Sequence, residues 1–138
     1  MRQEGWETRL NDYFESVHNV PFVWGECDCL IFASDAVKAI TGIDPMSKKK
    51  KGDPDTIRGL YTTQDEAKEL VKKYRKSLRD VMDVHFERKD LNFCKRGDVV
   101  LYKNAFGICV GRGIAFFKSE GLGLQVVKIR ECVLAWDT

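Results

Sequence analysis

The apolar residues of this chain recur at helical spacing over its first half and at strand-like spacing after residue 97. Spacings of three and four residues predict amphipathic helices over about residues 5–16, 29–41 and 64–74, with a shorter one around 78–84. Short apolar runs separated by glycines predict strands at about 99–102, 108–110, 114–117, 124–129 and 133–136. Helices followed by short, tightly connected strands indicate an α+β domain, with N-terminal helices packed on a C-terminal antiparallel sheet of about five strands.

Composition and charge are those of an ordinary folded domain. The chain has 138 residues, 43% of them hydrophobic and 32% charged, which suits a single domain over residues 1–138 without disulfides or metal. Its net charge of +2 gives no general attraction to nucleic acid or to an anionic membrane. One local run, Lys48 to Lys51, is basic. A solvated loop is its simpler interpretation, and contact with an acidic partner or a polyanion is the alternative.

The N-terminal residues and the hydropathy pattern indicate where in the cell the protein is expected. Residues 1–5 lack the apolar core of a signal peptide, and no stretch approaches the roughly 20 apolar residues that a membrane-spanning helix needs. We therefore expect the protein to be made and kept in a cytoplasm, unless it leaves as part of a larger particle. We expect no membrane partner.

The five cysteines are an odd number and show no recognisable pairing pattern. Free thiols in a reducing compartment are therefore expected. A zinc site built from Cys27, Cys29, Cys94 and His85 is conceivable. A Cys-x-Cys pair without a second close pair is poor zinc-ligand spacing, however, so we expect neither a metal nor another cofactor.

Of the five cysteines, Cys29 is the best candidate for a reactive residue, because it begins the second predicted helix. Asp28 before it is a favourable N-cap, and the apolar face of the helix turns Cys29 toward the rest of the fold. The helix dipole stabilises a thiolate at this position, and free backbone N–H groups there can contribute to an oxyanion hole. A cysteine so placed is otherwise a small core residue, and position alone leaves both roles open.

The segment that contains Cys29 resembles the nucleophile segment of NlpC-like peptidases, which have a papain-like fold. It reads Phe22-Val23-Trp24-Gly25-Glu26-Cys27-Asp28-Cys29, and residues 96–102 and 106–111 resemble the first strands of the family's sheet. More closely, the chain is similar to a phage and prophage branch of that superfamily whose function is unknown. That similarity rests on Gly-x-x-Asp-Cys, Asp44-Pro45, Arg58-Gly59-Leu60-Tyr61, Gly121-Leu122 and Ala135-Trp136.

The resemblance implies a nucleophile but no base. NlpC-like enzymes cleave peptide bonds in bacterial cell-wall peptides, and their nucleophile falls on Cys29. Their histidine falls on Ala105 or Phe106, and the polar residue that orients it falls near Phe117. Without an imidazole, the leaving amine has no general acid, a contribution of typically ~10²–10⁴-fold in rate.

The chain has two histidines, and neither occupies the matching position. His85 precedes the sheet and is a candidate substitute base only if its segment folds across the site. A surface or otherwise satisfied histidine is its simpler role. His18 precedes the nucleophile segment, where a loop histidine is again the simpler interpretation. Asp28 is expected to cap the helix beside Cys29 rather than to act as an acid.

Three hypotheses about function follow. The first is a catalytically degenerate NlpC-like domain of a phage or prophage tail. It would be made in the host cytoplasm, join other tail proteins in the virion and serve structure or assembly. The rival is an active cysteine peptidase or amidase that cleaves peptidoglycan peptides with a relocated histidine. The third is a cytoplasmic binding module that acts through Lys48 to Lys51. Nucleic acid is not expected as a partner.

Overall fold

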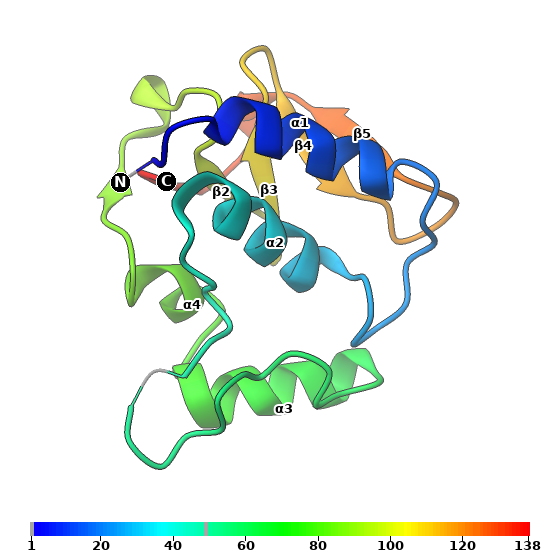
Figure 1. Ribbon diagram of the computed structural model, residues 1–138, viewed down its shortest axis with the longest axis vertical. Coiled ribbons are helices and arrows are strands. Elements are labelled where there is room, and N and C mark those ends of the chain that lie inside the picture. Colours follow the sequence, from blue (N-terminus) through cyan, green and yellow to red (C-terminus); the bar gives the residue numbers. More distant parts are fainter. Residues whose placement is uncertain (1, 49) are drawn as a thin grey trace.

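The computed structural model describes residues 2–48 and 50–138, and its helices lie to one side of a single sheet (Figure 1). The described residues form an α+β domain, with three N-terminal helices packed on a six-stranded antiparallel sheet. The helices are α1 (Trp6–Val17), α2 (Cys29–Thr41), α3 (Gln64–Arg75) and the short α4 (Asp80–Asp83). The strands are β1 (Arg88–Lys89), β2 (Val99–Tyr102), β3 (Ala105–Cys109), β4 (Ile114–Phe117), β5 (Leu124–Val127) and β6 (Leu134–Trp136). The expected fold class is confirmed at this level.

The sheet has the strand order β1-β6-β2-β3-β4-β5, and all neighbouring strands are antiparallel. It contains one strand more than the five expected, because β1 pairs Arg88 with Trp136 and Lys89 with Ala135. Two charged residues carry no alternating apolar signal, so the pattern could not mark this strand. The last strand enters between β1 and β2 and therefore lies inside the sheet.

The two faces of the sheet belong to two separate clusters of buried residues. Val99, Leu101 and Trp136 pack in the larger cluster with the helices, whereas Val100 and Ala135 pack in a smaller cluster on the other face. This alternation is the ordinary consequence of a pleated strand. The central helix is α2, which packs against both α1 and β3. Cys29 is therefore fixed at one end of the most deeply embedded helix.

The long loop between α2 and α3 is held down by two arginines. Arg58 places Nε 2.7 Å from Oδ2 of Asp44 and Nη1 2.7 Å from Oδ1 of Asp35. Arg75, which is 1% exposed, donates to the main-chain oxygen of Ser47. Charge-assisted contacts of this kind order a segment that would otherwise be costly to fix. The Asp-Pro and Arg-Gly segments of the sequence thus tie this loop to α2 and α3.

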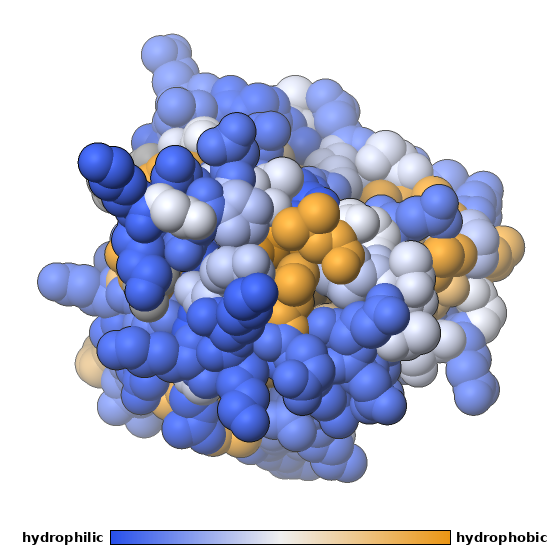
Figure 2. Space-filling view, turned by 90° about the horizontal axis from the view of Figure 1, so that it is seen from below, coloured by the Kyte–Doolittle hydropathy of each residue, from blue (hydrophilic) through white to orange (hydrophobic). Residues whose placement is uncertain are grey.

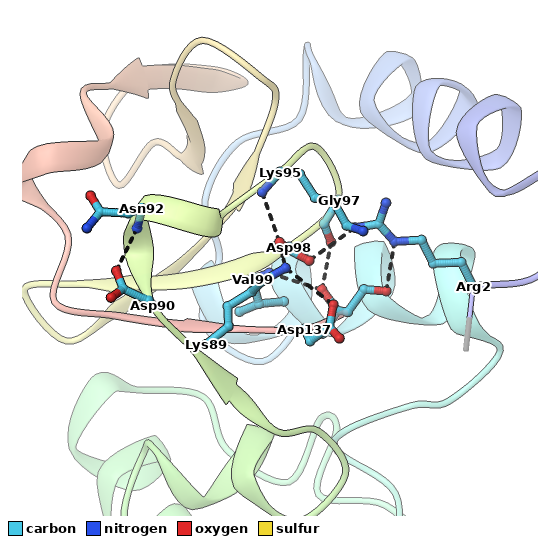
Figure 3. Close-up of polar contacts among 10 residues, drawn as sticks. Arg2, Lys89, Asp90, Asn92, Lys95, Gly97, Asp98, Val99 and Asp137 are labelled. Carbon is cyan, nitrogen blue, oxygen red and sulfur yellow. Dashed lines mark hydrogen bonds and ion pairs between the residues drawn. The ribbon is translucent and has the colours of Figure 1, made fainter.

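Both ends of the described chain are fastened to the start of β2 (Figure 3). The buried carboxylate of Asp98 accepts from Arg2 Nη2 at 3.0 Å and from Lys89 Nζ at 2.8 Å. The hydroxyl of Thr138 accepts from the backbone N–H of Val99 at 3.0 Å. We call Arg2, Lys89, Asp98 and Thr138 the terminal clasp. The Gly-Asp segment before β2 therefore has a structural role in this fold.

Candidate functional site

The start of α2 is organised by Asp28, whose side chain is fully buried. Its Oδ1 accepts from the N–H of Ile31 at 2.9 Å, which makes Asp28 the N-cap of the helix. Its Oδ2 accepts from the N–H of Gly25 at 2.9 Å and from the hydroxyl of Tyr61 at 2.8 Å. With three donors engaged, this carboxylate positions the first turn that carries Cys29 and is not available as an acid.

The turn that leads into α2 depends on glycine. Val23 and Cys27 exchange two backbone hydrogen bonds of 2.9 Å each, which closes a tight turn around Gly25. Gly25 has φ +85°, and a Cβ there would lie 2.0 Å from the carbonyl oxygen of Tyr61. No other residue fits without displacing that backbone. The Gly-x-x-Asp-Cys segment thus brings Trp24 and Cys29 together on a rigid support.

A cleft of about 720 Å³ lies beside the N-terminus of α2, bounded by α3, the β2–β3 turn and the end of β4. Cys29 is half-buried and lines it. Half of the lining residues are apolar and buried or half-buried, namely Phe22, Trp24, Leu30, Ala67, Val71, Leu78, Tyr102, Ala105, Phe116 and Phe117. Neutral polar groups are supplied by Gln64, Ser77, Asn104, Ser119 and Gln125. The cysteine therefore opens onto a largely apolar surface.

The positions on which the NlpC-like resemblance places a base and its orienting residue hold no proton-transfer group. Ala105 and Phe117 both line the cleft, whereas Phe106 is 1% exposed and belongs to the main core. Phe117 stacks on Phe22 at 5.9 Å and on Phe32 at 6.0 Å between ring centroids. A methyl group and a stacked phenyl ring thus stand where the resemblance would require an imidazole and its orienting partner.

Neither histidine is among the described residues that line the cleft. His85 is half-buried, and its Nε2 has no hydrogen-bond partner in the described part of the chain. Burial and the charge of Arg75 lower the pKa of His85, and Asp44 opposes them. His18 is exposed at the end of α1, with Nδ1 2.6 Å from the carbonyl oxygen of Glu15. The structure therefore brings neither imidazole to Cys29.

The electrostatic environment keeps Cys29 protonated. Burial raises the pKa of its thiol from the ordinary value to about 12, and the charge of Asp28 acts in the same direction. The N–H groups of Leu30 and of Cys29 itself favour the thiolate but do not offset these two effects. A thiol with a pKa this high is a poor nucleophile at neutral pH, because the thiolate is the reactive form.

The other cysteines lie apart from the cleft. All five are free thiols: Cys27 is half-buried against the main core, whereas Cys94, Cys109 and Cys132 belong to the smaller cluster on the opposite sheet face. Among the described residues, no group of three or more His, Cys, Asp or Glu side chains is arranged to hold a metal ion. Within residues 2–48 and 50–138, no helix combines the length and apolar character that a membrane span requires.

The rim of the cleft is basic. Lys68, Lys72, Lys76 and Lys103 are exposed and line it, and no acidic side chain is among its described lining residues. We call these four residues the cleft lysines. Three of them follow one another at intervals of four along and just beyond α3, which places them on one side of the helix.

The outer side of α3 is different in charge. A shallow hollow there is lined by Leu60, Leu70, Asp65, Glu66, Glu69, Lys72 and Lys73, so Lys72 borders both this hollow and the cleft. Seen from below, the molecule is largely hydrophilic, with an apolar patch at the centre of this face and smaller ones toward its edges (Figure 2). Among the described residues, lysines without acidic side chains line the cleft, whereas charges of both signs line the hollow on the outer side of α3.

The basic run at residues 48–51 lies outside the cleft. Lys48, Lys50 and Lys51 are exposed on the loop between α2 and α3, and Lys49 lies outside the described residues. None of the three described lysines lines the cleft. The basic loop and the cleft lysines are thus separate features, which substitutions can test independently.

Residues 1–138 match the family described as "Domain of unknown function (DUF6950)". The chain belongs to this family. No curated protein matches the chain, and neither does any solved structure. The family's description assigns neither an activity nor a superfamily, so the function of this DUF6950 member has to be argued from the cleft itself.

Sequence reasoning located some parts of this site and missed others. Cys29 and Asp28 stand at the start of a helix where the local pattern placed them, and Ala105 and Phe117 line the same cleft. The contact of Tyr61 with Asp28 was missed, because it joins residues 33 positions apart and leaves no local signal. The cleft lysines were missed as well, although Lys68 and Lys72 lie four residues apart along a predicted helix and Lys76 follows at the same interval just beyond it.

Proposed function

We propose that this DUF6950 chain is an NlpC-like domain with a papain-like fold from a phage or prophage tail, that it has lost peptidase catalysis, and that it serves tail assembly by binding. The observation that carries this proposal is a cleft in which Cys29 begins a buried helix but meets no imidazole among the described lining residues. The helix-then-sheet order of the chain supports the papain-like comparison.

The chemistry of the cleft favours binding over cleavage. A cysteine peptidase has to ionise its thiol and then protonate the leaving amine. With a pKa of about 12, Cys29 would be ionised to roughly one part in 10⁵ at pH 7, the difference being about five units. The polar groups of the lining are ammonium, amide and hydroxyl groups, none of which accepts a proton readily at that pH.

An activity measurement tests the loss of catalysis. Purified chain, a Cys29→Ser variant and a Cys27→Ser variant would each be incubated with isolated peptidoglycan, and released peptides would be quantified by mass spectrometry. We expect no release above the blank for any of them. Release that Cys29→Ser abolishes and Cys27→Ser retains would establish the rival function, an active cysteine peptidase or amidase acting on cell-wall peptides.

The proposed place of action has its own test. On this proposal the protein is made in the host cytoplasm and then incorporated into the tail of the virion, where other tail proteins are its partners. Mass spectrometry of purified particles should detect the chain in constant proportion to the tail proteins. Particles that are complete but consistently lack the chain would remove the tail assignment, while the loss of catalysis would remain a separate question.

A further inference from the structure

The cleft lysines carry unneutralised charge. No ion pair joins Lys68, Lys72, Lys76 or Lys103 to any acidic side chain in the described part of the chain. Lys103 Nζ lies 5.2 Å from the ring centroid of Tyr102, which orders the side chain without cancelling its charge. Several unpaired cations around a low-dielectric hollow concentrate a positive potential there and attract anionic groups.

The backbone conformation singles out the same residues. Three non-glycine residues have positive φ in residues 2–48 and 50–138, namely Lys76 (62°), Lys103 (46°) and Asn104 (63°), and all three line the cleft. Lys103 and Asn104 are the central residues of the β2–β3 turn, a conformation that favours asparagine and glycine. Lys76 is the centre of a γ-turn that the N–H of Ser77 closes on the carbonyl oxygen of Arg75 at 2.6 Å.

Lysine is a poor choice for these turns on conformational grounds alone. Glycine would adopt either positive φ without steric cost, whereas a lysine side chain crowds its own backbone. Such strain persists in proteins where the residue contributes something else, and it collects at functional sites. The strained backbone of Lys76 and Lys103 therefore fits a role for their positive charge at the rim of the cleft.

The rest of the cleft indicates what kind of anion fits. Aromatic and aliphatic surface comes from Phe22, Trp24, Leu78 and Phe117. The side-chain amides of the lining, which belong to Gln64, Asn104 and Gln125, can hydrogen-bond the peptide groups of a ligand. The volume of about 720 Å³ falls within the range of ~300–1,000 Å³ that binding sites occupy. A ligand that uses all these features has carboxylates, an apolar anchor and a peptide backbone.

We infer that the cleft binds an acidic peptide segment of a partner protein, with an aromatic or aliphatic side chain on the apolar floor and carboxylates on the cleft lysines. This inference rests on the proposed function, because it assumes a cleft that binds and does not cleave. A small inorganic anion would leave the apolar floor unused. Nucleic acid is less suited, because no arginine lines the described cleft and the outer side of α3 carries acidic residues.

Two pools of synthetic dodecapeptides would test the inference on the full chain. Both have a central Leu-Phe pair. One pool has flanks randomised among Asp, Glu, Ser and Gly, and the other has Lys and Arg in place of the acids. Peptides retained on immobilised protein would be sequenced, and their affinities measured by fluorescence anisotropy. We expect enrichment from the acidic pool, at least tenfold weaker binding when salt rises from 50 to 500 mM, and protection of Cys29 from a maleimide reagent.

Variants place the binding in the cleft. Lys68→Glu combined with Lys103→Glu should weaken binding at least tenfold. Lys50→Glu combined with Lys51→Glu makes the same change of charge on the exposed loop. It should leave the affinity for the acidic peptide within twofold of that of the parent protein. If a cleft variant were to fold poorly, Lys103→Asn with Asn104→Gly removes one charge from a turn that then suits its sequence better, and it should also weaken binding.

The outcomes separate the two proposals. Equal retention of both pools, or weakening by the loop variants and not by the cleft variants, would overturn the acidic-peptide inference and leave the loss of catalysis standing. Preferential binding of a single-stranded oligonucleotide through the cleft lysines would also overturn it. Cleavage of the retained peptides that depends on Cys29 would instead refute the proposed function.

Discussion

At the scale of single residues, Asp28 and Tyr61 hold the first turn of α2 together. The Tyr61 hydroxyl donates to a fully buried carboxylate at 2.8 Å. Hydrogen bonds to charged groups contribute about 1.5–3 kcal/mol, so we expect Tyr61→Phe to lower the free energy of unfolding by about that amount in urea titrations. Tyr74→Phe, a half-buried tyrosine on α3, is the control and should change it by less than ~0.5 kcal/mol. Equal losses would mean that the Asp28 contact contributes nothing specific.

His85 gives the fold a pH dependence. Burial and Arg75 lower its pKa, so the unfolded chain binds the proton more readily than the folded one. Stability is therefore fully present above the ordinary histidine pKa of about 6.5 and falls as the pH drops below it toward the lower folded pKa. Urea titrations between pH 7.5 and 5.5 should show this decline, reduced in His85→Leu and retained in His18→Leu. An unchanged decline in His85→Leu would assign it to other groups.

At the scale of elements, the β2–β3 turn is strained by Lys103, which has a φ of 46°. Replacement by the Asn-Gly pair that this turn type favours should stabilise the fold by about 0.4–1 kcal/mol in urea titrations. Lys51→Asn changes an exposed lysine that is not among the described residues with positive φ, and it should give no comparable gain. A double variant that is no more stable than the parent would show that the turn is not strained as described.

The helices and strands also show which structural features a local sequence pattern can predict. Apolar spacing placed α1, α2 and α3 within about a residue or two of their observed bounds, and capping chemistry placed the starts of α2 and α3. Strand β3 begins at Ala105, earlier than the apolar run at 108, because its first residues include a small side chain and a glycine. The cleft itself depends on how α3 packs near the sheet, which no local pattern contains. Tertiary contacts of this kind are set by the whole chain.

At the scale of the whole molecule, the terminal clasp ties distant parts of the chain to one buried carboxylate. Asp98 has no exposed side-chain surface, while Arg2 and Lys89 are 20% and 17% exposed. Asp98→Ala removes the buried carboxylate that pairs with Arg2 and Lys89 and leaves Lys89 only its 3.4 Å contact with Asp137, and we expect a loss of about 3–5 kcal/mol in the free energy of unfolding. Arg88→Met breaks the more exposed pair with Asp83 and should cost much less, because solvent screens exposed ion pairs. Similar losses in the two variants would contradict the structural role of the clasp.

The central claim, a nucleophile position without activation, is tested most directly by the reactivity of the Cys29 thiol. Iodoacetamide alkylation would be followed from pH 5 to pH 10 and read at Cys29 by peptide mapping, with the other four cysteines as internal controls. A thiol whose pKa is about 12 should react about tenfold faster for each pH unit, without a plateau in this range. A plateau with its midpoint at or below pH 7 would reveal a cationic partner and contradict the account.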